Sequence, residues 1–511
     1  MVPPRSCSAR RLDSLDVIGT AHESRGACTH QAGDSVTELT YQPAAELLDQ
    51  LTAKRVSARE LLDAHVLRHE KRHDTINAVI TTDLAGAKAM AQEIDDARAR
   101  GEAVGPLAGL PMTVKDGYDV TGMPAVAGMP AYADRQPDCP DAALVAKLRA
   151  AGVVIWGKTN VPLMLGDFQS YNAVYGTTNN PYDLARTPGG SSGGAAAALA
   201  SGITPLEIGS DIGGSLRHPA NWCGVYSLKP TWNLLSMRGH VPPPPGRHSD
   251  MDHLGVGGPM ARTANDLRLL FGALREDAAP ARQDISGARI GLWLDEPGFP
   301  VSNEVRAAVE AAAAALRRQG AAVEAVILPF PAADLLDNYL SLLYPIIGAG
   351  FPSAVYTALE QQRDAYVPGE DGELDPYGMT SLAVRATASY RSVARALADR
   401  QAMKEGIAAW LTQTDAILAP VSGVTAFTHR QEGTLTNRTI EVDDVAVPYA
   451  HLFDWVSLAT NLHLPAVTAP ARRTASGLPV GVQLIGGWHG EDRLLDLAEA
   501  LEAETGGFEA P

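Results

Sequence analysis

Short apolar runs that are typical of buried strands alternate with amphipathic helical segments along most of this chain. The runs include Leu110 to Val114, Val153 to Trp156 and Ala288 to Trp293, and helical periodicity follows over 303 to 319. A strand that returns parallel to its predecessor needs a long crossover, which is usually a helix. The alternation therefore predicts an α/β fold with much parallel sheet. Because no repeat or clean linker divides the chain, we expect a single large domain.

Two local patterns refine this organisation. Ser57 and Glu60 have the spacing of a capping box, in which each side chain binds the main-chain amide of the other residue. Residues 331 to 410 are mostly helical by pattern, with a polar Gly/Pro break at Pro368 to Pro376. We expect this insert to lie over a site as a cap.

The N-terminal segment differs from the rest. Residues 1 to 37 contain basic side chains but no apolar core of a signal peptide, and acidic residues interrupt them. We expect these residues to form a disordered tail, which places the folded domain at 38 to 511.

Charge and cysteine content limit the partners of the chain. Its formal net charge is −17 over 511 residues, so its field repels nucleic-acid phosphates and anionic lipid surfaces. The longest apolar runs fall far short of the roughly 20 residues that cross a bilayer. The four cysteines form no CxxC pair, which favours a reducing compartment. We therefore expect a cytoplasmic protein that binds neither nucleic acid nor membrane.

Two glycine-rich clusters stand out. The first, Arg186-Thr-Pro-Gly-Gly-Ser191-Ser192-Gly-Gly-Ala195, places two serines among glycines, which permit backbone angles forbidden to other residues. Such a run alone is typical of a linker or tight turn. The second, Gly209-Ser-Asp211-Ile212-Gly213-Gly214-Ser215-Leu-Arg217, follows an apolar stretch. Successive amides of Ile212, Gly213, Gly214 and Ser215 would form a pocket for a developing oxyanion, with Ser215 placed as a nucleophile.

A serine that attacks an amide needs a base to remove its proton. His218 lies three positions after Ser215, on the same turn, where a side chain rarely points back at the hydroxyl. A lysine can serve if burial lowers its pKa, because desolvation penalises the ammonium form. Lys115 ends the apolar strand that begins at Leu110 and meets this requirement. Alone, it would be interpreted as a surface lysine.

Taken together, three segments resemble the amidase signature family: Gly109-Leu-Pro-Met-Thr-Val-Lys115-Asp116, the Gly-Gly-Ser-Ser-Gly-Gly run and Asp211-Ile-Gly-Gly-Ser215. The spacing of the two serines (215 − 191 = 24) also matches, as does the run Gly477-Leu-Pro-Val-Gly-Val-Gln-Leu-Ile-Gly486. The resemblance covers nearly everything from residue 42 onward. It implies a large mixed sheet flanked by helices on both faces.

The same resemblance implies the roles of the site residues. A neutral Lys115 would deprotonate Ser191, which sits on a cis peptide bond in this family, and Ser191 would take the proton from Ser215. Ser215 would attack the carbonyl, and water would later release the acyl group. Ser192 would support the relay, and Asp211 and Arg217 would brace the loop. No cofactor and no metal is implied.

Other interpretations of these motifs remain open. Gly189-Gly-Ser191-Ser-Gly193 fits the G-x-S-x-G elbow of an α/β-hydrolase-like esterase with Ser191 as nucleophile, although the preceding residues are typical of turns rather than a strand. His65, His69 and His73 recur every four residues on a predicted helix and could face a metal, but a solvated face is the ordinary interpretation.

A further alternative concerns the assembly. The chain resembles, in its core, the subunits of amidotransferases that act as glutaminases with partner proteins. An inactive, partner-binding paralogue would usually have lost Lys115, Ser191 or Ser215, and all three are present.

The substrate is indicated only by segments that vary within the family. These are Asp167 to Asn172, Pro242 to Pro245 with His248 and His253, the 331 to 410 insert, and Val421 to Trp455. The loop Arg238 to Gly246 and the region from Pro448 to Trp455 look like those of aryl acylamidase-like and urethanase-like members. Candidate wall residues are Tyr344, Phe351, Tyr356 and Trp455. We expect a small neutral amide, an aryl acylamide or a carbamate as substrate, and a monomer or homodimer.

Overall fold

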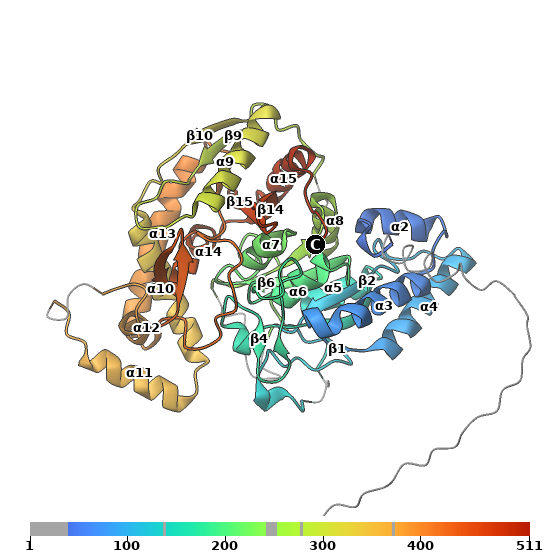
Figure 1. The fold of residues 1–511 in the computed structure, drawn as a ribbon, viewed down its shortest axis with the longest axis horizontal. Coiled ribbons are helices and arrows are strands. Elements are labelled where there is room, and N and C mark those ends of the chain that lie inside the picture. Colours follow the sequence, from blue (N-terminus) through green and yellow to red (C-terminus); the bar gives the residue numbers. More distant parts are fainter. Residues whose placement is uncertain (1–38, 136–138, 242–252, 276–279, 370–373) are drawn as a thin grey trace, which may run out of the picture.

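The computed structural model describes residues 39–135, 139–241, 253–275, 280–369 and 374–511 (Figure 1). The expected tail at 1 to 37, the Pro242 to Pro245 loop and His248 lie outside these residues.

An eight-stranded mixed sheet forms the centre of the molecule. Only its first two pairings, β10 with β9 and β9 with β11, are parallel, and the five that follow are antiparallel. The mixed sheet that the resemblance implies is therefore confirmed, whereas the expectation of much parallel sheet is wrong for most of it. In order across the sheet the strands are β10 (Ala322–Ala325), β9 (Arg289–Leu292), β11 (Ala416–Pro420), β15 (Pro479–Ile485), β14 (Ala466–Arg473), β7 (Tyr226–Lys229), β8 (Val256–Ala261) and β6 (Leu206–Asp211).

A smaller sheet lies beside the free edge of β6. It contains β1 (Val79–Thr82), β3 (Val154–Thr159) and β2 (Pro111–Lys115), with β2 parallel to β3. Strand β2 packs against β6, and the Thr113 amide donates to Thr204 Oγ1 over 3.2 Å. Every residue of β2 and β6 is buried. This contact brings the C-terminal ends of two strands, Lys115 and Asp211, to one place.

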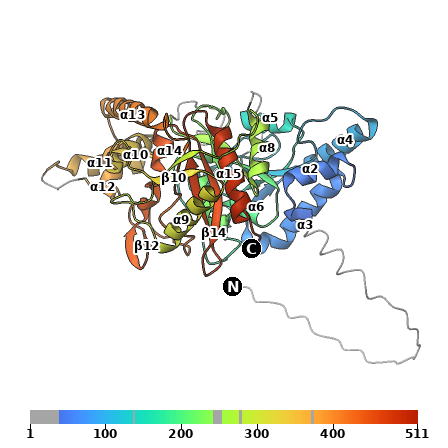
Figure 2. The same ribbon diagram turned by 90° about the horizontal axis from the view of Figure 1, so that it is seen from above.

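Helices cover both faces of the large sheet, as the resemblance implies (Figure 2). Because side chains alternate along a strand, neighbouring residues of β11 belong to different cores. Leu418 packs in the core that includes α8 (Ala264–Leu274), α9 (Asn303–Arg318) and α15 (Glu491–Thr505). Ile417 packs in the core that includes the insert helices.

The described residues of the insert at 331 to 410 form four helices, and the second ends at Ala365 while the third begins at Met379. They are α10 (Ala332–Ala349), α11 (Ser353–Ala365), α12 (Met379–Ala386) and α13 (Tyr390–Leu411). Helix α10 also packs against α14 (Ser457–Asn461). In Figure 1 these helices lie at the end of the molecule opposite the N-terminal helices.

The remaining elements are helices outside the insert and two short hairpins, β4–β5 and β12–β13. The predicted capping box is confirmed at α3 (Ala58–Ile76), where the Ser57 and Glu60 side chains each accept from the amide of the other. Within the described part of the chain, no helix is both long and apolar enough for a bilayer span. The other elements are α2 (Ala44–Thr52), α4 (Leu84–Arg100), α5 (Ala143–Ala150), α6 (Gly193–Ala200), α7 (Arg217–Cys223), β4 (Tyr171–Asn172), β5 (Gly176–Thr177), β12 (Thr439–Val442) and β13 (Val445–Pro448), with 3-10 turns at Pro130–Tyr132, Leu163–Leu165 and Tyr449–Phe453.

Candidate active site

Lys115 ends strand β2 with its ammonium nitrogen in the protein interior. Its Nζ lies 2.7 Å from Ser191 Oγ, 2.9 Å from Ser210 Oγ and 3.3 Å from the Ser210 carbonyl oxygen. The side chain is 0% exposed, and burial lowers the pKa of Lys115 to about 7, against the opposing charges of Asp211 and Glu207. A substantial fraction of this lysine is therefore neutral near pH 7, as a proton acceptor must be.

Ser191 lies in the first glycine-rich cluster, just before α6. The Gly190–Ser191 peptide bond is cis, as the resemblance implies, and Gly189 has φ +95°. A Cβ on Gly190 would lie 2.4 Å from the Asp167 carbonyl oxygen, so only glycine fits there. The glycines thus let the chain pass close to its neighbours and hold Ser191 against Lys115.

Ser215 follows the end of β6 in the second glycine-rich cluster. It is 7% exposed, whereas Ser191 is 1% exposed, so exposure decreases from Ser215 through Ser191 to Lys115. The two clusters are joined directly, because the Ser192 amide donates to the Ser215 carbonyl over 3.2 Å. Ser192 Oγ also donates to the Ser210 carbonyl over 3.3 Å. The structure therefore brings together Lys115 and the three predicted serines.

The main-chain amides of the Ser215 loop are not equally free. The Gly214 N–H donates to Asp211 Oδ1 over 2.9 Å, and the Leu216 N–H donates to Asp211 Oδ2 over 3.1 Å. Asp211 thereby shapes the loop but occupies the Gly214 amide, one of the four predicted oxyanion donors. The amides of Ile212, Gly213 and Ser215 remain as candidates.

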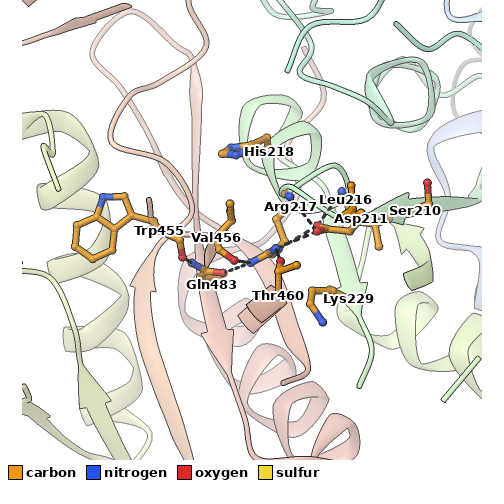
Figure 3. A network of polar contacts seen from close by, with 12 residues as sticks. Ser210, Asp211, Leu216, Arg217, His218, Lys229, Trp455, Val456, Thr460 and Gln483 are labelled. Atoms are coloured by element: carbon orange, nitrogen blue, oxygen red, sulfur yellow. Dashed lines mark hydrogen bonds and ion pairs between the residues drawn. The ribbon is translucent and has the colours of Figure 1, made fainter. Parts of the chain in front are cut away.

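A buried ion pair fixes this loop to the rest of the sheet. Arg217 Nε and Nη2 each lie 3.0 Å from an oxygen of Asp211, and both side chains are 0% exposed. Arg217 also donates to Thr460 Oγ1 on α14 over 2.7 Å and to Gln483 Oε1 on β15 over 3.1 Å (Figure 3). Burial would raise the pKa of Asp211, but the Arg217 charge and hydrogen bonds hold it well below its usual range.

We expect Asp211→Asn to lower the free energy of unfolding by about 3 kcal/mol, the cost of leaving a buried partner charge uncompensated. Since the pKa of Asp211 is depressed in the folded state, its contribution is present above its unfolded pKa of about 4 and is lost as the pH falls. Urea unfolding of both proteins at pH 7 and at successively lower pH measures the difference, which should shrink on acidification. A difference that is constant with pH would contradict this account.

The histidines that stand out in the sequence do not reach the serines. His218 Nε2 lies 3.0 Å from the Leu452 carbonyl oxygen, and its ring stacks on Trp222 and points away from Asp211 (Figure 3). Burial and Arg217 lower the pKa of His218 to about 3. His65 Nδ1 lies 3.3 Å from the Gly202 carbonyl, and His69 packs on Trp156. Among the described residues, no group of His, Cys, Asp or Glu is arranged to hold a metal.

Two neighbours of Lys115 are not evident from the sequence. Ser210 contacts Lys115 directly, and His240 Nε2 lies 2.9 Å from Ser210 Oγ. His240 reaches this position through an antiparallel bridge with Tyr118, more than a hundred residues earlier. No local pattern could have revealed this pairing.

Aromatic side chains surround the Ser215 loop. The Tyr339 hydroxyl on α10 donates to the Ile212 carbonyl over 2.7 Å, and a Cβ on Gly213 would lie 3.0 Å from the ring of Phe453. The ring of Tyr344 lies 6.4 Å from that of Phe453. Of the other predicted wall residues, Trp455 is buried against Trp293, and Phe351 and Tyr356 are half-buried on the insert.

The variable segment at 167 to 172 contacts the residues on either side of the β12–β13 hairpin. Asp167 forms an ion pair with Arg438 over 2.6 Å and accepts from the Tyr449 hydroxyl over 2.7 Å. The rings of Trp222 and Phe427 make an edge-to-face contact in the same region. Segments from three distant parts of the chain therefore meet beside the Ser191 cluster.

Comparison with known proteins identifies the family. The family model described as Amidase matches residues 60–495. A glutamyl-tRNA(Gln) amidotransferase subunit of Ralstonia nicotianae is 33% identical, over 89% of this chain and 96% of its own length. One similar solved structure is a chain from a vestigial protein complex that reveals the evolutionary origins of an s-triazine catabolic enzyme. It superimposes with a TM-score of 0.77 at 29% identity, and the match covers 92% of this chain and 100% of that chain. A bacterial aryl acylamidase has the same fold, with a TM-score of 0.76 at 23% identity over 92% and 97% of the two chains. The chain belongs to the amidase signature family.

The α/β-hydrolase interpretation of Ser191 does not fit this fold. A nucleophile elbow needs a strand directly before the serine. Residues 178 to 190 contain only turns and isolated bridges, and Ser191 is followed by α6 in an amidase fold.

Proposed function

We propose that this protein cleaves the carbon–nitrogen bond of an amide through an acyl-enzyme on Ser215. The observation that carries the proposal is the 2.7 Å contact between Lys115 Nζ and Ser191 Oγ, made by a fully buried lysine beside the Ser215 loop. A buried amine with a lowered pKa in contact with a hydroxyl is the arrangement that activates a serine without histidine. The membership of the amidase signature family supports the same chemistry.

In the proposed reaction, Lys115 accepts the proton of Ser191, and Ser191 accepts the proton of Ser215. Ser215 Oγ forms a bond to the substrate carbonyl carbon, and amides of Ile212, Gly213 and Ser215 hold the oxygen as it becomes negative. When the carbon–nitrogen bond breaks, the proton returns along the same relay to the leaving amine. Water then attacks the ester, is deprotonated by the same groups, and releases the acid from Ser215.

Asp211 and Arg217 act on this reaction indirectly in our proposal. Their buried ion pair fixes the amides of the loop, and Ser192 holds the two glycine-rich clusters together through its bond to the Ser215 carbonyl. These three residues position the reacting groups without contacting the substrate. We further propose that the helices of the 331 to 410 insert cap the site, since Tyr339 on α10 contacts the Ile212 carbonyl.

Two kinds of amide have separate support. Glutamine, as the ammonia donor of an amidotransferase, is favoured by the relatives: the Ralstonia nicotianae protein and its counterpart from Salinispora tropica, 32% identical over 93% of this chain, bear the name of the same glutamyl-tRNA(Gln) amidotransferase subunit. A small neutral amide, aryl acylamide or carbamate is supported by the rings of Tyr339, Tyr344 and Phe453 beside the loop. The relatives support glutamine more strongly than the rings support a neutral amide.

The experiment that separates them is a substrate panel with the purified chain alone. Glutamine, primary carboxamides, anilides and carbamates are compared by release of ammonia, aniline or alcohol. Turnover of anilides or primary amides with no preference for glutamine supports the independent amidase, and turnover confined to glutamine supports a role within an amidotransferase. If no amide or carbamate is cleaved and a fluorophosphonate fails to label Ser215, the proposed chemistry is wrong.

A further inference from the structure

Ser210 is shared between Lys115 and a histidine that the proposed reaction does not use. Its hydroxyl oxygen lies 2.9 Å from Lys115 Nζ and 2.9 Å from His240 Nε2. His240 is held by its bridge with Tyr118, by the Val241 amide, which donates to the Gly117 carbonyl over 2.7 Å, and by edge-on contact with the Tyr118 ring at 5.0 Å. The imidazole is thus fixed one hydroxyl away from the proposed base.

The hydrogens available around Lys115 restrict how it can act. A neutral amine has two N–H bonds and one lone pair, and it has three polar neighbours: Ser191 Oγ, Ser210 Oγ and the Ser210 carbonyl. The carbonyl only accepts, so it takes one N–H. The remaining N–H and the lone pair must be divided between the two hydroxyls.

Only one division leaves Lys115 able to act as a base. If Ser210 donates its proton to His240, Ser210 must accept from Lys115, and the lysine lone pair then faces the Ser191 proton. If instead the Ser210 hydroxyl donates to Lys115, the lone pair is occupied and Lys115 donates to Ser191. In the first division, the proton transfer from Ser191 to Lys115 reverses no other hydrogen bond, which is the preorganisation that favours catalysis.

We propose that His240 is a positioning residue that accepts the Ser210 proton at Nε2 and thereby turns the lone pair of Lys115 toward Ser191. This inference rests on the proposed function of Lys115. It requires a neutral imidazole whose proton is on Nδ1. In the described residues the ring contacts the Tyr118 ring and the Ser210 hydroxyl, and the charge of Lys115 acts on it through Ser210. Burial, together with Lys115 when that residue is charged, lowers the pKa of His240 to about 3, so the ring is neutral near pH 7, where the proposed base is deprotonated.

The test compares side chains that can and cannot accept at the Nε2 position. Glutamine places an amide oxygen near that position, asparagine is too short, and leucine has no acceptor. We expect His240→Leu and His240→Asn to lower the rate of Ser215 labelling by a fluorophosphonate about tenfold, the net worth of one oriented hydrogen bond. His240→Gln should keep the rate within about threefold of the parent, since it restores the acceptor.

A double replacement distinguishes this role from a structural one. In Ser210→Ala the hydroxyl is absent, so adding His240→Leu should not lower the labelling rate of Ser215 any further. If the two replacements acted through independent packing effects, their fold-losses in labelling rate would multiply. Equal rates for the leucine, asparagine and glutamine variants, or multiplicative losses in the double variant, would overturn the proposal. Lys115→Met is measured alongside: if it labels as fast as the parent, the proposed function itself fails, and if it is slow while His240→Leu is fast, only the role of His240 fails.

Discussion

Ser215→Ala should abolish amide cleavage, with a loss on the order of 10⁴-fold or more, because no other group in the proposed reaction can form the acyl-enzyme. The same variant should lose the covalent adduct that a fluorophosphonate forms with the parent protein. Intact-protein mass spectrometry before and after treatment measures the adduct, and peptide mapping identifies the residue.

A buried serine elsewhere provides the matched control for this replacement. Ser201 lies at the end of α6, is buried, and its hydroxyl has no hydrogen-bond partner among the described residues. Ser201→Ala removes the same oxygen atom at a distance from the site and should leave both turnover and labelling unchanged. If Ser215→Ala retained the adduct, or if peptide mapping placed it on Ser191, the nucleophile would be assigned wrongly.

Lys115→Met should lower kcat/KM by about 10³-fold, within the range of general acid–base catalysis, because methionine fills the space without accepting a proton. The parent should also show a specific pH dependence. Since the base must be neutral and the pKa of Lys115 is about 7, kcat/KM should fall about tenfold per pH unit well below pH 7 and become level above it. A pH–rate profile of parent and variant measures both effects, and the variant should lose this slope.

A second buried lysine separates the loss of a base from the loss of a buried side chain. Lys229 is also fully buried, with its pKa lowered to about 7 by desolvation and Arg217, but its Nζ donates to the carbonyls of Pro230 and Leu464. Lys229→Met should reduce thermal stability and keep the pH slope. If the slope were lost in Lys229→Met and kept in Lys115→Met, the proposed base would be the wrong lysine.

The residues of the candidate site could be predicted from the sequence because each stands in a local pattern. Ser191 and Ser215 lie among glycines whose backbone freedom the structure uses, at Gly189 and Gly214 for example. Lys115 stands at the end of an apolar run in the sequence, and β2 does end there. The family resemblance then joins segments that the residues alone cannot relate.

What could not be predicted depends on contacts between distant segments. The approach of His240 to Ser210 needs the bridge to Tyr118, and the occupation of the Gly214 amide needs the rotamer of Asp211. The antiparallel centre of the sheet could not be foreseen because β15 pairs with β11 and β14 pairs with β7, strands that lie far from them in the sequence. Alternating apolar runs predict strands and helices, but they do not fix the direction in which strands pair.

The boundary between the two sheets affects the order in which activity and structure are lost during unfolding. Lys115 comes from the three-stranded sheet, whereas Ser215 follows β6 at the edge of the eight-stranded sheet. Side-chain packing and a few hydrogen bonds join the two sheets. Because residues of both sheets belong to one hydrophobic core, a local shift at the contact between β2 and β6 would separate the Lys115 amine from the serine hydroxyls before the core as a whole unfolds. We expect turnover to vanish at a lower denaturant concentration than the circular dichroism signal.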